Sequence, residues 1–221
     1  MSRFYRPLIL LLGLGLIIIV GFHFSLSALT DPVRFAGCSS LSDTGEIDPT
    51  QTVAIWQNRS LNAPLALAAS LTDKEKQVLG VASGEKWIEV DLGKQMLIAH
   101  QGDTIFLQSS ISSGLWNKTP VGEYRIWYKI RATKMEGGSR LNNTYYYLPN
   151  VPYAMFYQGS YGIHGTYWHS NFGTRMSHGC VNTPTPVAEK LFYWTDPQLP
   201  SGKGIVRSDD SHPGTKVIVH D

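Results

Sequence analysis

The chain has few cysteines and few charged residues for its length of 221. Its two cysteines, Cys38 and Cys180, allow one disulfide at most, and charged residues make up 16% of the sequence, with a net charge of +2. No lysine- or arginine-rich block is longer than a few residues, so the sequence gives no reason to expect a nucleic-acid partner. The helical zinc motif HExxH is also absent.

Acidic residues are missing from the whole stretch between Glu136 and Glu189. Within it lie His164 and the run SHGCVN, Ser177–Asn182, which contains Cys180. A thiol beside histidines and a glycine is what nucleophilic acyl chemistry needs, because a base removes the thiol proton and the glycine lets a substrate carbonyl approach backbone N–H groups. Any carboxylate that orients the base must come from far away in the sequence.

An apolar run occupies the N-terminus. Pro7–Phe24 is almost uniformly apolar and follows Arg3 and Arg6. Eighteen helical residues reach about 27 Å, enough to cross a bilayer core, and the two arginines favour a cytoplasmic N-terminus. We therefore predict a membrane anchor over residues 1–24, with the rest of the chain in the cell envelope on the extracytoplasmic face. A cleaved signal peptide or a lipidated Cys38 are the alternatives.

The predicted compartment is oxidising, so the two cysteines could form a disulfide. A bridge between Cys38 and Cys180 would consume the thiol of the SHGC motif, and we therefore expect Cys180 to be reduced and Cys38 to be an incidental thiol. Residues 25–85 have the composition of a stalk or linker. A short helix is expected within Leu61–Gly80, which either packs on the main domain or holds that domain away from the membrane.

A compact domain is predicted over residues 86–220. Alternating apolar and polar residues over Trp87–Leu92 and Gln95–His100 are typical of a β-hairpin. Further strands are expected over Thr104–Ile111, Val121–Ile130, Tyr145–Leu148, Tyr153–Tyr157 and Lys216–Val219. Thr183–Pro186, with a threonine cap and a first-turn proline, should start a helix over Val187–Trp194. The predicted fold class is mostly β, a sandwich or open barrel with one or two short helices.

One arrangement of motifs resembles a known family. His164, a gap of twelve residues and then Ser177–Asn182 resemble the signature of the L,D-transpeptidase (YkuD-type) catalytic domain. The likeness covers roughly residues 86–219, and it implies that family's mostly β fold. Three further segments are similar to the family in its usual order: Ile88–Leu97, Thr119–Tyr124 and Gly214–Val217.

The resemblance implies peptidoglycan cross-linking outside the membrane. The thiolate of Cys180 would attack the amide bond between an amine-bearing third residue and the terminal D-alanine of a stem tetrapeptide, so that D-alanine leaves and a thioester remains. The side-chain amine of another stem would then form a 3→3 link. The resemblance implies no metal or cofactor, and it implies that β-lactams of the carbapenem class acylate Cys180.

The predicted catalytic residues have distinct roles. Cys180 is the nucleophile, and because a free thiol has a pKa of about 8.5 it needs a base, for which His164 is the first choice and His178 the second. The resemblance implies that the backbone carbonyl of Gly165 orients His164. The N–H groups of Gly179 and Cys180 are expected to form an oxyanion hole.

Five more residues are candidates for substrate contact, although each also has an ordinary structural role open to it. Residues 131–150 occupy the place of the family's lid, so tyrosines near them are expected either to line the groove or to pack between strands. The candidates are Asn182, which could instead fix the loop, Trp168, which could be core, Tyr157, Arg175, which could bind a substrate carboxylate, and Ser177.

Three other functions stay open from the sequence. The same site could hydrolyse the bond as an L,D-carboxypeptidase, because water and amine compete for one thioester. A zinc site could form from His164, His169, His178 and Cys180, although their spacing matches no zinc motif. The domain could also be a non-catalytic wall-binding module on a membrane tether.

Overall fold

The computed structural model describes residues 44–68, 70–81 and 84–221, all within one compact unit, Ala36–Asp221. The predicted membrane segment over residues 1–24 and the second cysteine, Cys38, lie outside the described residues. None of the helices in the described part of the chain is long and apolar enough to cross a membrane.

The first sheet contains the hairpin that the alternating sequence predicts. β3 (Lys86–Asp91), β4 (Met96–Gln101) and β5 (Thr104–Ser110) pair antiparallel in succession. β12 (Lys216–His220) lies parallel to β3 and antiparallel to β6 (Gly122–Arg125). The resulting order, β5-β4-β3-β12-β6, places the last strand of the chain inside the sheet, between β3 and β6.

The second sheet is built around one long strand, β8 (Tyr146–Gln158). β7 (Tyr128–Gly137) pairs with β8 along most of its length, and β8 also pairs with β9 (Tyr161–Thr166) and with β1 (Val53–Trp56). The remaining strands extend the sheet: β10 (Val181–Pro184) lies parallel to β9, β2 (Arg59–Asn62) beside β1, and β11 (Ile205–Arg207) beside β7.

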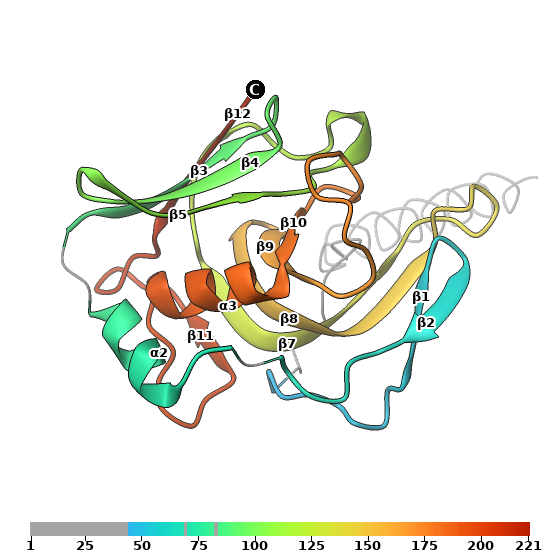
Figure 1. Cartoon of the computed structure of the whole chain (residues 1–221), viewed down its shortest axis with the longest axis horizontal. Helices are drawn as coiled ribbons and strands as arrows, with labels where there is room; N and C mark the ends of the chain where they lie inside the picture. Colours follow the sequence, from blue (N-terminus) through green and yellow to red (C-terminus); the bar gives the residue numbers. More distant parts are fainter. Residues whose placement is uncertain (1–43, 69, 82–83) are drawn as a thin grey trace, which may run out of the picture. The chain divides into compact units, whose positions relative to one another are not determined.

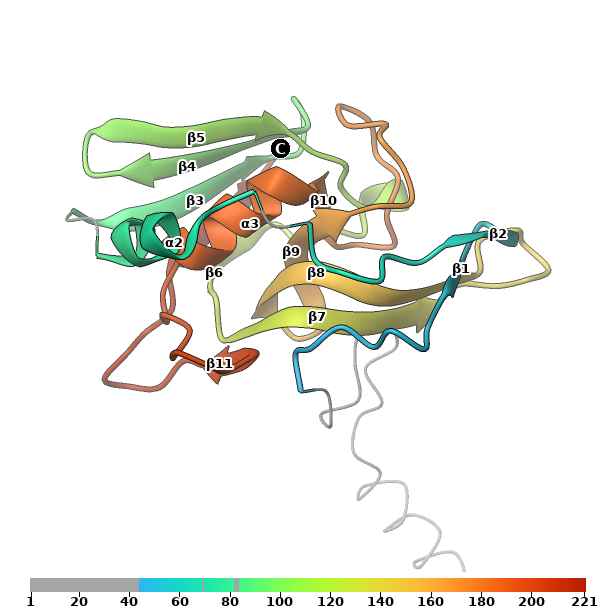
Figure 2. The same cartoon turned by 60° about the horizontal axis from the view of Figure 1, so that its bottom comes forward.

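The helix α3 (Thr185–Trp194) lies between the two sheets (Figure 1), and Figure 2 shows it from below. Its apolar face joins buried residues of both sheets in the main core. α2 (Asp73–Gly80) packs against α3 and starts with a capping box, in which the Thr72 hydroxyl and the Glu75 carboxylate each accept from the other residue's N–H. A short 3₁₀ turn, η1 (Leu115–Asn117), follows β5.

The two strands expected over Tyr145–Leu148 and Tyr153–Tyr157 are one strand in the structure, β8. The first proline between them, Pro149, is tolerated because the pairing register shifts there, between Thr133 and Met135, and Asn150 takes a positive φ of 58°. The strand expected over Val121–Ile130 divides instead into β6 and β7, which belong to different sheets.

The threonine cap predicted for α3 is not formed. The N-cap residue is Pro184, and no side chain caps the helix. The Thr183 hydroxyl donates instead to the carbonyl of His164 at 3.1 Å, and the Thr185 hydroxyl donates to the carbonyl of Thr166 at 3.3 Å. These threonines therefore hold the start of α3 against β9.

Much of the predicted linker packs on the domain. Residues 44–81 contribute β1, β2 and α2, and β1 joins the second sheet. The helix expected within Leu61–Gly80 forms only from Asp73 onward. The chain before it is fixed by Glu189 of α3, whose carboxylate accepts from the N–H and hydroxyl of Ser70 at 2.7 and 2.6 Å.

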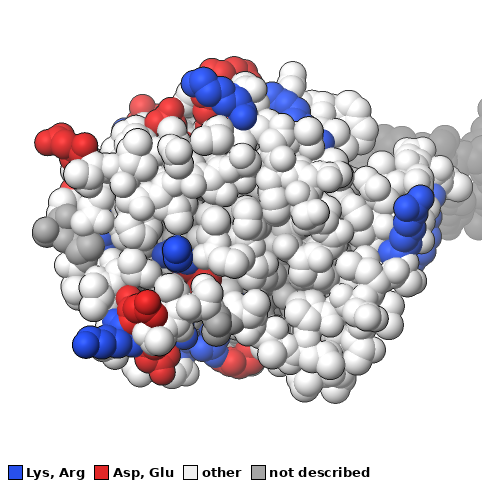
Figure 3. Space-filling view, in the orientation of Figure 1, with Lys and Arg blue, Asp and Glu red and all other residues white. Residues whose placement is uncertain are grey.

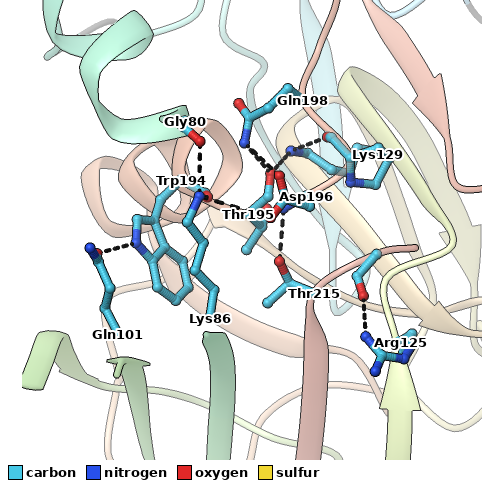
Figure 4. A network of polar contacts seen from close by, with 12 residues as sticks. Gly80, Lys86, Gln101, Arg125, Lys129, Trp194, Thr195, Asp196, Gln198 and Thr215 are labelled. Atoms are coloured by element: carbon cyan, nitrogen blue, oxygen red, sulfur yellow. Dashed lines mark hydrogen bonds and ion pairs between the residues drawn. The ribbon is translucent and has the colours of Figure 1, made fainter. Parts of the chain in front are cut away.

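Two lysines anchor the chain at the end of α3 (Figure 4). Lys129 is fully buried and donates to the carbonyls of Thr195 and Pro197 at 2.7 and 2.9 Å. Burial lowers the pKa of Lys129 to about 7. Lys86 donates to the carbonyl of Trp194 and to the last carbonyl of α2, both at 2.9 Å, and so ties the two helices together.

Candidate active site

One pocket of about 80 Å³ brings most of the predicted site residues together. Among the residues that the structure describes, no Lys, Arg, Asp or Glu lines it. The face seen in Figure 3 carries its charged side chains at the top, at the right edge and in the left half, and a broad uncharged area lies right of the centre. The lining residues are Trp56, Met135, Tyr146, Leu148, Ser160, Tyr161, His164, Trp168, Ser177, His178, Cys180 and Asn182.

The SHGC loop is bonded at both ends to the stretch of chain between β5 and η1. Ser112 exchanges two backbone hydrogen bonds with Asn182, each 2.9 Å long. At the other end Ser177 donates to the carbonyl of Ser113 at 3.0 Å and accepts from the N–H of Leu115 at 2.9 Å. The loop therefore has a fixed conformation before any substrate arrives.

Gly179 is required by the shape of this loop. Its φ is +139°, and an added Cβ would lie 2.3 Å from Cε1 of Tyr161. Its carbonyl accepts from the Thr119 hydroxyl at 2.9 Å. Its N–H donates to Oγ of Ser177 at 3.0 Å. The Ser177 hydroxyl in turn donates to the carbonyl of Cys180 at 2.5 Å, which orients its oxygen to accept from Gly179. In this structure the predicted oxyanion donor of Gly179 is thus engaged within the loop.

His164 is buried on β9, with 2% of its surface exposed. Its Nδ1 lies 3.0 Å from the carbonyl oxygen of Gly165, which is the contact that the resemblance implies. A carbonyl can only accept, so Nδ1 carries the proton and Nε2 is the acceptor of the neutral ring. Gly165 permits this close packing, since a Cβ there would lie 2.8 Å from Cγ of Pro152 and 3.2 Å from Cα of Thr185.

Cys180 is a half-buried thiol that directly precedes β10. The parallel pairing of β10 with β9, Val181 opposite Ile163, places it next to the strand that carries His164. Its Sγ lies 3.7 Å from the carbonyl oxygen of Ser160. The structure therefore brings a thiol and a buried imidazole to the same small pocket, as nucleophilic acyl chemistry requires.

His178 lies on the SHGC loop with both ring nitrogens buried and without a hydrogen-bond partner. Its ring centroid is 4.8 Å from that of Tyr146. Burial and the positive charge of Lys118 lower the pKa of His178, while Cys180 opposes the shift. A neutral ring offers one donor and one acceptor, so His178 has hydrogen-bonding capacity to give to a substrate.

Trp168 and Asn182 are also at the pocket, as predicted. The Trp168 ring lies 5.7 Å from that of His164, and its Nε1 is buried without a partner. The Asn182 amide donates to Nε2 of His169 at 2.8 Å, so it fixes the loop that carries Trp168. Burial lowers the pKa of His169 to about 4, which keeps the ring neutral, so one ring nitrogen can accept. Within residues 44–68, 70–81 and 84–221, no group of three or more His, Cys, Asp or Glu could hold a metal ion.

Two predicted substrate contacts lie elsewhere. Tyr157 is 3% exposed, because β8 turns its ring into the main core, 5.4 Å from the ring of Tyr124. Burial raises the pKa of the Tyr157 hydroxyl well above its ordinary value. Arg175 donates to the carbonyl of Leu92 at 3.3 Å and lies 3.7 Å from the carboxylate of Asp221. Neither residue lines the pocket.

Sequence reasoning missed part of the pocket wall. Met135 and Leu148 lie in the region predicted as a lid, residues 131–150, but were not singled out there, whereas Tyr146 is one of the tyrosines expected either to line the groove or to pack between strands. Trp56 lies in the predicted linker. The signal for Trp56 was the short apolar run Val53–Trp56 followed by the polar pair Gln-Asn. In the structure both turn residues have positive φ, which is typical of a two-residue hairpin turn.

A family model described as YkuD, L,D-transpeptidase catalytic domain, matches residues 85–219. The chain is similar to a mutant Enterococcus faecium L,D-transpeptidase, with 30% identity over 62% of this chain and 50% of that one and a TM-score of 0.46. An L,D-transpeptidase from Mycobacterium smegmatis is 19% identical over 63% and 60% of the two chains, with a TM-score of 0.51.

The catalytic domain of the E. faecium L,D-transpeptidase acylated by ertapenem is 28% identical over 62% of this chain and 98% of that one, with a TM-score of 0.45. No curated protein matches the chain. The likeness to the M. smegmatis protein shows the fold. The chain spans about half to three fifths of the length of the first two relatives.

Proposed function

Because the chain belongs to the YkuD family of L,D-transpeptidase catalytic domains, we propose that it forms 3→3 cross-links between peptidoglycan stem peptides through a thioester on Cys180. The observation that carries this proposal is the shared pocket of Cys180 and His164, with Nδ1 of His164 held by the Gly165 carbonyl. Peptidoglycan lies outside the membrane, so the proposal includes an extracytoplasmic domain behind an N-terminal anchor.

In the first half-reaction His164 Nε2 takes the proton of the Cys180 thiol. The thiolate attacks the carbonyl carbon between the third residue and the terminal D-alanine. The protonated imidazole then gives its proton to the departing amine, the C–N bond breaks and a thioester forms. The Gly165 carbonyl supports this sequence because it keeps Nδ1 protonated in both states and stabilises the imidazolium that forms.

The tetrahedral oxyanion needs hydrogen-bond donors from the SHGC loop. The Gly179 N–H would exchange the Ser177 hydroxyl for the oxyanion, replacing a neutral acceptor by a charged one. His178 supplies a further donor, since both its ring nitrogens are buried without a partner. His178 therefore contacts substrate in this proposal, and His164 alone acts as the base.

In the second half-reaction the side-chain amine of another stem attacks the thioester carbon. The amine loses a proton to His164, the thiolate leaves, and the 3→3 amide bond remains. Water at the same step would give a shortened monomer, which is the L,D-carboxypeptidase reaction. A relative of this chain is known in a form acylated by ertapenem, which supports acylation of Cys180 by carbapenems here.

The proposal is tested by intact-mass measurement of the full chain after exposure to a carbapenem or a stem tetrapeptide fragment. We expect one adduct on the wild type, none on Cys180→Ala and almost none on His164→Ala. His212→Ala is the matched control, because this histidine is exposed and hydrogen-bonded to Asp209 outside the pocket.

A wild-type protein whose thiol is confirmed as reduced but which forms no adduct with either reagent would overturn the proposal and leave a wall-binding module. The tetrapeptide products distinguish the two reactions. A cross-linked dimer indicates transfer, and a shortened monomer indicates hydrolysis.

A further inference from the structure

The pocket wall includes one residue from outside the matched catalytic domain. Of the twelve lining residues, eleven lie within residues 85–219, and one, Trp56, precedes that range. Trp56 ends β1 and pairs in register with Tyr146 of β8, another lining residue. A segment predicted from the sequence to be a linker therefore contributes a residue directly to the candidate active site.

The hairpin that carries Trp56 is fixed at its turn. The turn residues Gln57 and Asn58 have φ values of 50° and 61°, and the turn connects Trp56 to Arg59. Asn58 binds the tip of the β7–β8 hairpin, because its side-chain amide donates to the carbonyl of Arg140 at 2.9 Å. The turn is thus hydrogen-bonded to the predicted lid region.

The base of the hairpin is fixed as well. Gln51 accepts from the Tyr147 hydroxyl at 2.8 Å. The N–H of Asp48 donates to the side chain of Asn150 at 2.9 Å, and that side chain also donates to the Asp48 carbonyl at 2.9 Å. Hydrogen bonds on both sides of β1 hold the indole in place, so the wall it forms is part of the folded domain.

The indole of Trp56 lies near Tyr146 and Trp168, the two aromatic residues that contact His178 and His164. Its ring centroid is 6.2 Å from that of Tyr146 and 5.9 Å from that of Trp168. Tyr146 in turn contacts the ring of His178, and Trp168 contacts that of His164. Trp56 therefore joins Tyr146 and Trp168 in an aromatic wall of the pocket that Cys180 also lines.

The pocket is small and uncharged. Its volume of about 80 Å³ is well below the roughly 300–1,000 Å³ of a pocket for a drug-sized ligand. Its wall is apolar or aromatic on the side of Trp56, Tyr146 and Trp168, with Met135 and Leu148 beside them. Burying a charge there without a partner would be costly, so the group that enters is small and uncharged.

We propose that Trp56 is a specificity-determining residue that limits the size of the donor's terminal side chain. The proposal rests on the proposed function, in which the terminal residue of the donor is D-alanine. The third residue carries a long amine-bearing chain that exceeds a chamber of this size, whereas the methyl group of D-alanine fits. Trp56 belongs to the aromatic wall against which that methyl group packs, and larger terminal side chains collide with it.

The test compares two tetrapeptide donors that end in D-alanine or D-leucine, with the acylation rate of Cys180 measured by intact mass. We expect the wild type to prefer D-alanine, since one added group in a tight pocket changes kcat/KM by about 10- to 200-fold. Trp56→Ala should reduce that preference at least about tenfold, by raising the rate with D-leucine. Trp56→Leu should reduce it less.

Arg59→Ala is the matched control, because Arg59 pairs opposite Trp56 in the same hairpin, is exposed and does not line the pocket. It should keep the wild-type preference. Thermal unfolding checks each variant, and Trp56→Leu decides the matter if Trp56→Ala does not fold. An unchanged preference in a folded Trp56 variant, or equal loss with both donors, overturns the proposal. If the wild type acylates with neither donor nor a carbapenem, the proposed function itself fails.

Discussion

In the network of Figure 4 two lysine amines each donate hydrogen bonds to two backbone carbonyls. In the candidate active-site pocket, by contrast, some buried polar atoms have no hydrogen-bond partner. Lys129 and Lys86 each donate twice, at 2.7 to 2.9 Å. Both ring nitrogens of His178 and Nε1 of Trp168 lack any hydrogen bond. Leaving such atoms unpaired costs about 1–3 kcal/mol each. The pocket therefore keeps hydrogen-bonding groups that the fold itself does not use.

Burial acts on titration in both regions, with different consequences. It lowers the pKa of Lys129 to about 7, and the charged amine is then stabilised by carbonyls that also join α3 to the following chain. It also lowers the pKa of His178, but no hydrogen-bond partner compensates there. The lysine network therefore contributes to the fold, and the histidine pocket is prepared for a ligand.

The largest expected effect is on the pocket, from Gly179→Ala. The new Cβ would lie 2.3 Å from the ring of Tyr161 at a φ of +139°, so the SHGC loop must shift. A displacement of about 1 Å at a reacting group costs on the order of 100-fold in rate, and we expect at least that loss in acylation of Cys180. Intact-mass kinetics with a carbapenem measures the rate.

Gly202→Ala is the matched control for this change. Gly202 also has a positive φ, +71°, but a Cβ there would meet nothing within 4 Å. It should lose roughly 1 kcal/mol of stability from backbone strain and keep the acylation rate. Equal acylation rates in the two alanine variants would show that the loop tolerates a side chain at Gly179.

Much of the site's chemistry was predictable because it lies in contiguous motifs. The SHGC run contains the nucleophile and its glycine, and the His-Gly pair contains the base and its glycine. The pairing of β9 with β10 then brings these two motifs together in space. The hairpin of β3 and β4 was predictable for the same reason, because alternating residues and a glycine-containing turn are local signals.

The rest of the pocket depends on contacts between distant segments. Trp56 reaches the site only because β1 pairs with β8, some ninety positions later. Tyr157 and Arg175 do not line the pocket, and sequence does not reveal that β8 turns the first inward or that Leu92 and Asp221 bind the second. Their contact with substrate stays a prediction. Side-chain direction and long-range strand pairing are therefore what the sequence left undetermined.

Disrupting the lysine network should lower the stability of the fold and leave the acylation rate unchanged. Lys129→Met removes the donor for two buried carbonyls, those of Thr195 and Pro197. We expect a loss of about 1–3 kcal/mol in the free energy of unfolding, measured with urea, and an unchanged acylation rate in the folded protein. Lys134→Met, at a side chain 47% exposed, is the control and should change neither quantity. A folded Lys129→Met protein with impaired acylation would break the division between the two regions.

The same lysine predicts a pH dependence of stability. Its pKa falls from an ordinary 10.5 to about 7 on folding, so between these values the unfolded chain binds a proton that the folded chain lacks. The free energy of unfolding contributed by Lys129 therefore rises with pH through this window, and it is lost as pH falls towards 7. Urea unfolding at pH 7, 8 and 9 should show a steeper rise for the wild type than for Lys129→Met. Identical pH profiles would contradict the lowered pKa.

The smallest expected effect is electrostatic and confined to the pocket. The exposed cation Lys118 disfavours protonation of His178, so Lys118→Met should raise the pKa of that histidine, measured by NMR titration of its ring protons. The shift should shrink at high salt, because solvent and ions screen an exposed charge. Lys203→Met removes an equally exposed charge at the turn before β11 and should leave the His178 titration unchanged. A similar rise in the pKa of His178 in both variants would mean that net charge, and not Lys118 in particular, causes the effect. Burial alone would then explain the lowered pKa of His178.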